Sequence, residues 1–178
     1  YLIRALTPFA VLEHGDVAAL TAANGPSMIL LEDRVLTPAA AGNLRDWMGG
    51  GGVLVRFAGP NLAAAGDDLL PVRLRRGDRA FGGALTWTAP ARLALFPPTS
   101  PFAGLTLSPE VTVNRQVLAE PSLDLSERSW ARLDDGTPLV TARPVDKGWL
   151  VLFHTTANTA WSNLALSGLF VDMLRRLS

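Results

Sequence analysis

The sequence predicts an α/β fold with a mainly parallel β-sheet flanked by helices, and three observations support this class. Short apolar runs at Ser27–Leu31 and Gly52–Phe57 enclose a helical pattern, a βαβ rhythm typical of parallel strands joined by right-handed crossovers. Residues 67–120 are rich in proline and have no run of helical length, which indicates an inserted antiparallel β region. Residues 130–177 indicate a β-meander followed by a helix. At 178 residues the chain suits one domain over 1–178, with about 67–120 as a β-rich insertion. Because it begins with Tyr1 rather than methionine, we expect a piece of a longer protein.

The first elements are short. An apolar helical pattern over residues 1–6 ends at Pro8, because the residue before a proline disfavours helical backbone. Ala10–Glu13 is a candidate strand. Asp16 is placed to cap a helix over 17–22, since an aspartate at this position accepts a hydrogen bond from the first helical turn.

The βαβ unit follows. Ser27–Leu31 is uninterrupted and apolar, which is typical of a strand buried on both faces. Thr37 and Pro38 are an N-cap and a first-turn proline, so they mark the start of a helix. Gly49–Gly52 ends that helix. A phosphate-binding loop precedes a helix, whereas this glycine run precedes a strand, so we interpret it as a helix C-cap and turn.

Within the insertion, four short runs are interpreted as antiparallel strands: Val72–Arg76, Phe81–Trp87, Leu93–Phe96 and Val111–Ala119. Alternation places Arg73 and Arg75 on one strand face, and with Arg76 and Arg79 they form a basic cluster. A solvated strand edge that blocks further pairing is the favoured interpretation. An anion site is the alternative.

The last third returns to regular patterns. Two turn signals, Asp134–Gly136 and Pro144–Gly148, separate apolar runs, which predicts a three-stranded meander. We expect Trp149, in the last of these runs, to be buried. Residues 163–177 have an amphipathic pattern that predicts a closing helix, with Asn163 as its cap.

Charge and residue types exclude several functions. The formal net charge is zero, so nothing indicates nucleic-acid binding. The absence of cysteine excludes disulfides, thiolate metal sites and cysteine nucleophiles. His14 and His154 are too few to form a metal site, and we expect no metal and no cofactor. The acidic pairs Asp67–Asp68 and Asp134–Asp135 are interpreted as a loop or cap and a turn rather than as catalytic dyads. No apolar run is long enough to span a bilayer.

The polar loop after the last predicted strand is the best candidate for a ligand site, because ligands of open α/β sheets bind beyond the carboxyl ends of the strands. The candidate ligand-binding residues come from this loop, from the predicted strand Gly52–Phe57 and from the segment after that strand. They are Arg56, Asn61, His154, Asn158 and Trp161. The competing interpretation, which we favour, is structural: His154 is held by neighbouring hydroxyl or backbone groups, and Trp161 packs as an apolar lid over the last helix. No catalytic residue is assigned.

Several motifs occur in one order along the chain: WMGGGGVLVRFAGPNLA, DDLLPV, SPF and DGTPLVTARPVDKGWLVLFHTTANTAWSNLALSGLFVDMLRR. In these motifs the chain resembles the soluble domain of bacterial membrane proteins that begin with an aerotolerance-type (Bat-like) double-transmembrane region, most specifically over Gly136–Arg176. The resemblance implies a class I glutamine amidotransferase-like fold, which is a flavodoxin-like sheet with added strands. Enzymes of that superfamily use a cysteine nucleophile that this chain lacks, so their histidine role is not transferred to His154.

The resemblance and the missing nucleophile favour a non-catalytic interaction or assembly domain with unidentified protein partners. They imply anchoring in the bacterial inner membrane through segments outside 1–178. The positive-inside rule then places this domain in the periplasm. Two alternatives stay open: a small-molecule sensor with a cleft at the strand carboxyl ends, and an amidotransferase-like hydrolase with an atypical site.

Overall fold

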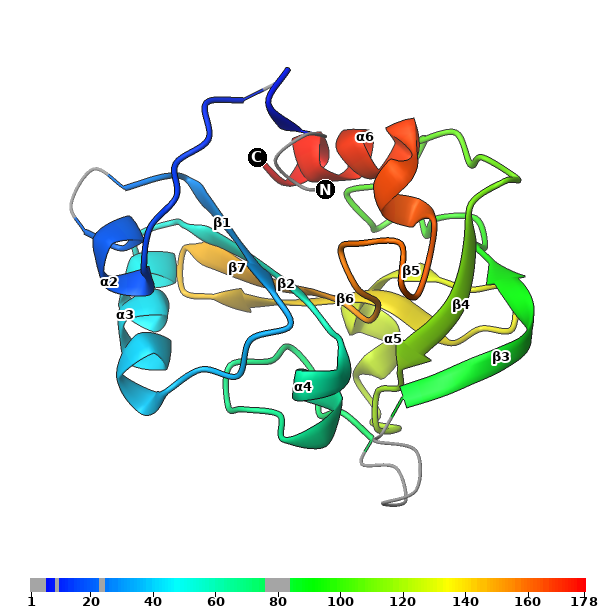
Figure 1. Cartoon of the computed structure of the whole chain (residues 1–178), viewed down its shortest axis with the longest axis horizontal. Helices are drawn as coiled ribbons and strands as arrows, with labels where there is room; N and C mark the ends of the chain where they lie inside the picture. Colours follow the sequence, from blue (N-terminus) through cyan, green and yellow to red (C-terminus); the bar gives the residue numbers. More distant parts are fainter. Residues whose placement is uncertain (1–5, 9, 23–24, 76–83) are drawn as a thin grey trace.

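The computed structural model describes residues 6–8, 10–22, 25–75 and 84–178. Its main element is a five-stranded sheet of order β1-β2-β7-β6-β5 (Figure 1). The strands are β1 (Met28–Glu32), β2 (Val53–Phe57), β5 (Ser129–Arg132), β6 (Pro138–Val145) and β7 (Gly148–Phe153). Strands β1, β2 and β7 run parallel, and β6 and β5 continue the sheet in antiparallel pairing. This confirms the expected α/β class, the parallel βαβ unit and the C-terminal meander.

Helix α3 (Pro38–Gly49) covers one face of the sheet. The Thr37 side chain accepts a hydrogen bond from Ala40 N, as an N-cap does. Leu44 and Met48 of this helix pack with Leu54 and Leu150 of the sheet. At the start of β7, a Cβ on Gly148 would lie 2.2 Å from Gly52 O, so the close approach of these segments requires glycine.

Helix α6 (Gly168–Leu177) covers the opposite face. Phe170 of the helix contacts Phe57 and Phe153 of the two central strands, with ring centroids 5.9 Å apart in both pairs. Because successive strand residues alternate between faces, these strands present apolar residues to both helices. That is why both strands are apolar apart from Arg56 of β2.

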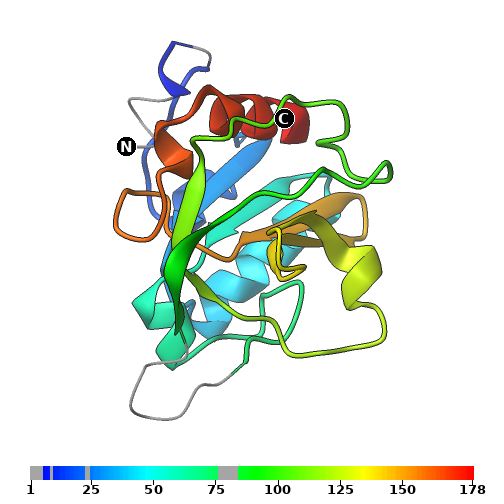
Figure 2. The same cartoon turned by 90° about the vertical axis from the view of Figure 1, so that its right-hand side faces the viewer.

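The insertion contributes a second, two-stranded sheet of β3 (Ala84–Arg92) and β4 (Thr112–Val117), paired antiparallel. Figure 2 shows this ribbon lying in front of the main sheet. Several hydrogen bonds join it to the main sheet and the loop that follows, among them Val117 N to His154 O and Asn114 N to Trp161 O. The expected β-rich region beside the sheet is therefore present.

Shorter helices complete the fold: α2 (Val17–Leu20), α4 (Pro60–Ala64), α5 (Leu125–Arg128) and the 3-10 helix η1 (Leu164–Leu166). The Asp16 side chain accepts from Ala19 N and caps α2 as predicted. Among the described residues, no helix is both long and apolar enough to cross a membrane.

Several expected strands are wrong. Ala10–Glu13 is irregular. Residues 72–75 form only an isolated bridge, Leu74 to Ala119, and residues 93–96 form only the bridge Leu93 to Leu133. These segments lack a neighbouring strand of matching length, so local alternation did not produce a ladder. Arg76, Arg79 and the start of the predicted strand at Phe81–Trp87 lie outside the described residues.

Other expectations need correction in burial or extent. In the part of the chain that the structure describes, no strand pairs with the outer side of β1, so it is an edge strand, and Ile29 is its one buried residue. Trp149 is 39% exposed instead of buried, since it is the second residue of β7 and lies at the amino end of the strand. The closing helix begins at Gly168, capped by Ser167, whereas the Asn163 side chain accepts from Thr112 N and donates to Glu110 O.

Candidate functional site

The carboxyl ends of the three parallel strands lead into Asp33, Ala58 and His154, and this edge is where the sequence places the site. The Asp33 carboxylate accepts hydrogen bonds from the backbone N–H groups of Gly59, Asn61 and Leu62 at 2.9–3.0 Å. A Cβ on Gly59 would lie 2.5 Å from the Asp33 carboxyl carbon, so glycine permits this approach. The first N–H groups of α4 are therefore occupied by the protein's own carboxylate.

Arg56 lies on the central strand β2 and is fully buried. Its Nη1 donates to Asp67 Oδ1 at 2.6 Å and its Nη2 donates to Asp67 Oδ2 at 2.8 Å, a bidentate ion pair. The same two nitrogens also donate to the carbonyls of Leu69 and Arg34, both at 2.5 Å. Both terminal nitrogens of Arg56 are therefore bonded to the protein itself.

The surroundings of Asp67, including Arg56, favour the ionised form of its carboxyl group. Burial raises the pKa of Asp67, whereas the hydrogen bond and the charge of Arg56 lower it. The backbone N–H groups of Leu36 and Leu69 act in the same direction, so the pKa lies below its ordinary value. With all these bonds made, Asp67 and the exposed Asp68 do not form a catalytic dyad. The Asp134–Asp135 pair forms a turn, in which Asp135 Oδ1 accepts from the N–H and the hydroxyl of Thr137.

His154 is fully buried at the end of β7. Its Nδ1 lies 2.7 Å from Val117 O, and its Nε2 lies 2.9 Å from Thr141 Oγ1. A carbonyl oxygen only accepts, so Nδ1 carries the proton, and in the neutral ring Nε2 accepts from the threonine hydroxyl. The ring thus connects β4, β6 and β7, as the structural interpretation of the sequence expected. His14, the other histidine, is exposed.

The three remaining candidates are separate. Asn61 Nδ2 donates to Asp33 O at 3.1 Å, beside a shallow hollow of about 460 Å³. Asn158 Oδ1 accepts from Ala160 N within its own turn. Trp161 is buried with Leu62 and Val117 rather than over α6, and its ring lies 5.5 Å beneath the Arg115 guanidinium. The structure does not bring the five predicted ligand-binding residues to one cavity, and their binding role stays a prediction.

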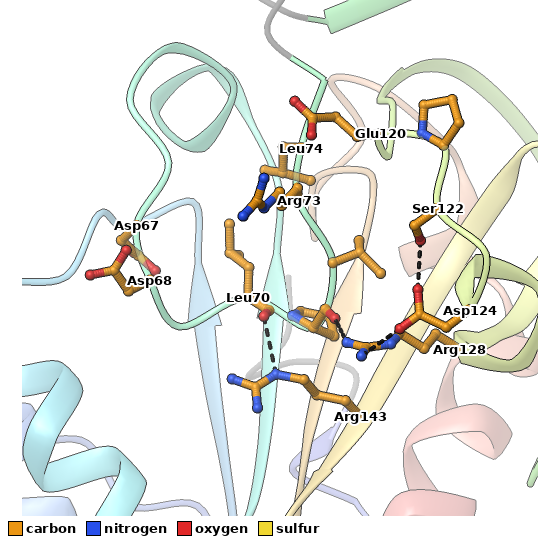
Figure 3. A pocket seen from close by; sticks show the side chains of 13 residues that line it. Asp67, Asp68, Leu70, Arg73, Leu74, Glu120, Ser122, Asp124, Arg128 and Arg143 are labelled. Atoms are coloured by element: carbon orange, nitrogen blue, oxygen red, sulfur yellow. Dashed lines mark hydrogen bonds and ion pairs between the residues drawn. The ribbon is translucent and has the colours of Figure 1, made fainter.

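A larger cavity, which sequence reasoning missed, lies elsewhere. It has a volume of about 970 Å³ and lies between residues 67–74 and 120–128. Arg73, Arg128 and Arg143 line it, together with carboxylates and prolines (Figure 3). The sequence held two signals for it, and the first is Arg143, a charged residue that follows Leu139–Ala142 in β6. Arg73 belongs to the basic cluster for which an anion site was the alternative.

Aromatic residues form a second feature that was not expected. Ring contacts run from Phe96 to Phe102 at 5.6 Å, from Phe102 to Trp130 at 6.1 Å and from Trp130 to Trp149 at 4.9 Å. Phe102 is buried, whereas Trp149 is exposed. We call these four residues the aromatic array.

Comparison with known proteins supports the fold and does not define a function. No protein-family model matches the chain, and no curated protein matches it. Cytoplasmic protein STM3548 from Salmonella typhimurium has a similar structure, with a TM-score of 0.65 at 14% identity over 97% of this chain and 76% of that one. Cytoplasmic protein STM1381 from Salmonella typhimurium LT2 has a TM-score of 0.56 at 14% identity, over 76% of this chain and 62% of that one.

A β-galactosidase from Bacillus circulans sp. alkalophilus is more distant, with a TM-score of 0.44 at 14% identity over 72% of this chain and 20% of that one. Similarity to the two Salmonella proteins at 14% identity establishes a shared fold, and it confirms the expected mixed α/β class. None of the comparisons links the chain to aerotolerance-type membrane proteins, so that part of the resemblance stays a prediction.

The His154 contacts predict a pH dependence of stability. Burial lowers the pKa of His154 from its ordinary 6.5 to about 4, against the opposing hydrogen bond to Val117. Above pH 6.5 both folded and unfolded chains are neutral at this residue. Between pH 6.5 and 4 the unfolded chain binds a proton that the folded chain excludes, so we expect the free energy of unfolding to fall by up to about 3 kcal/mol.

Chemical denaturation from pH 7 to pH 4.5 measures this change. His14→Gln removes the exposed histidine and retains the dependence, whereas His154→Gln loses it and is less stable at pH 7. A wild-type stability that stays constant over this range would show that His154 is not held as a buried neutral ring.

Proposed function

We propose that this chain is a non-catalytic interaction domain, which binds a partner protein through the exposed end of the aromatic array. The observation that carries the proposal is Trp149, the one exposed residue in an otherwise buried strand. Tryptophans that reach the surface are frequent anchors of protein interfaces, because they bury a large area with little loss of side-chain freedom.

The neighbours of Trp149 extend this apolar surface. Met28, Val53 and Trp149 are register partners across β1, β2 and β7, and the first two are only half-buried. Trp130 is also half-buried and contacts Trp149. Leu95, next to Phe96 in the chain, is 85% exposed. An apolar surface built from Trp149 and the half-buried Met28, Val53 and Trp130 is typical of a docking site.

The side chains at the carboxyl edge that could take part in catalysis are bonded to other groups of the protein, which supports a non-catalytic role. Asp33, Arg56 and His154 are the groups there that could act on a substrate, and all three are engaged by protein partners. Cysteine is absent from the chain. No group of three metal-binding side chains occurs in the part of the chain that the structure describes.

Photo-crosslinking in living cells tests the proposed surface. We expect p-benzoylphenylalanine at position 149 of the full-length protein to give a discrete crosslinked adduct with another protein. The same residue at position 123 is the control, because Leu123 is fully exposed and outside the aromatic array. Equal labelling from both positions, or none from position 149, would contradict a partner at this surface.

We also propose that the domain belongs to a membrane-anchored bacterial protein and lies in the periplasm. This rests on the sequence resemblance over Gly136–Arg176. Because the chain has no cysteine, Leu123→Cys in an otherwise cysteine-free full-length protein provides one reporter thiol. We expect a maleimide that cannot cross the inner membrane to label it in intact cells. Labelling only after the inner membrane is permeabilised would place the domain in the cytoplasm.

A further inference from the structure

The cavity between residues 67–74 and 120–128 has properties that the interaction surface does not explain. We propose that it binds a small organic anion, bearing carboxylate or phosphate groups, with Arg143 as its principal ligand. This proposal is independent of the aromatic array.

Arg143 is held in place by one hydrogen bond, but its terminal nitrogens have no hydrogen-bond partner among the described residues. Its Nε donates to Leu70 O at 3.2 Å, which fixes the plane of the guanidinium against the 67–74 segment (Figure 3). No hydrogen bond or ion pair joins its two terminal amines to any described residue. These amines form a planar pair of donors, the geometry that recognises carboxylate and phosphate.

The charges around Arg143 favour an added anion. Burial, and then the positive charges of Arg128 and Arg45, lower the pKa of Arg143. An arginine nevertheless stays cationic in proteins, so Arg143 keeps its positive charge near those of Arg128 and Arg45. No carboxylate forms an ion pair with Arg143 among the described residues. An anion bound there would reduce this repulsion and replace the water lost by burial.

The carboxylates that line the cavity do not supply this anion. Asp67 is paired with Arg56, and Asp124 is paired with Arg128 and accepts from Ser122. The two others are Asp68 and Glu120. Figure 3 shows Asp68 on the outer side of the 67–74 segment and Glu120 at the end of the cavity far from Arg143.

A second cation and the cavity size define the ligand class further. Arg73 is exposed and projects from the 67–74 segment nearer to Glu120, so it can contact a second polar group of an extended ligand. A volume of about 970 Å³ is at the upper end of small-molecule sites. The lining is mainly polar, which favours a hydrophilic metabolite over an apolar one.

Calorimetric titration with inorganic phosphate and with citrate tests the proposal. At low ionic strength, where screening is weak, we expect the wild type to bind at least one probe. Arg143→Gln keeps a donor for Leu70 O and removes the charge, so binding should weaken about tenfold or more. Arg176→Gln on α6 removes the same charge at an exposed position away from the cavity and should leave binding unchanged.

Arg73→Gln provides a second variant in case Arg143→Gln is poorly folded, because Arg73 is exposed and supports no described contact through its side chain. It should weaken binding several-fold. Binding of phosphate alone would indicate a phosphorylated ligand, and binding of citrate alone a carboxylic acid. Failure of the wild type to bind either probe, or equal binding by both cavity variants and the wild type, would overturn the proposal.

Discussion

The ion pair between Arg56 and Asp67 is the contact on which the arrangement of the carboxyl edge depends. A guanidinium on the central parallel strand is fully buried, and a buried charge is tolerated only when it is paired and its donors are bonded. Asp67 and the carbonyls of Arg34 and Leu69 meet this requirement. These bonds hold the segment after β1 and the 67–74 segment against β2. The 67–74 segment is also a wall of the large cavity.

The other polar groups of this edge follow the same logic. Asp33 caps α4, and His154 joins strands of both sheets through one neutral ring. A fold of this class offers its strand ends as a ligand site, yet here the strand-end groups are used to hold loops in place. The groups that remain available lie elsewhere. Arg143 faces the cavity from β6, and Trp149 is exposed at the amino end of β7. The two proposed functions therefore use residues other than the five that the sequence indicated as ligand-binding.

The sequence predicted what depends on neighbours along the chain. The βαβ unit, the meander and the caps at Asp16 and Thr37 are set by apolar runs, turn residues and hydrogen bonds over three residues. Contacts across long separations were not predictable: the Arg56–Asp67 pair spans 11 residues and the His154–Val117 bond spans 37. Trp149 shows the same limit, because an apolar run predicts a buried strand but does not show which of its residues the neighbouring elements leave uncovered. Asn163 looked like a helix cap, but its tertiary bond to Thr112 determines its role.

We infer that the charged groups of the carboxyl edge hold the fold and do not bind a ligand. Chemical denaturation of Asp67→Asn tests it most directly, with Asp68→Asn as the matched control at an exposed neighbour. Leaving Arg56 without its carboxylate should lower the free energy of unfolding by about 3–5 kcal/mol, and the control should change it little. The double variant Arg56→Met, Asp67→Asn should recover much of the loss, because it removes the unpaired buried charge and keeps an amide oxygen that can accept from Leu36 N or Leu69 N. An Asp67→Asn protein as stable as the wild type would contradict the account and return Arg56 to the list of candidate ligand-binding residues.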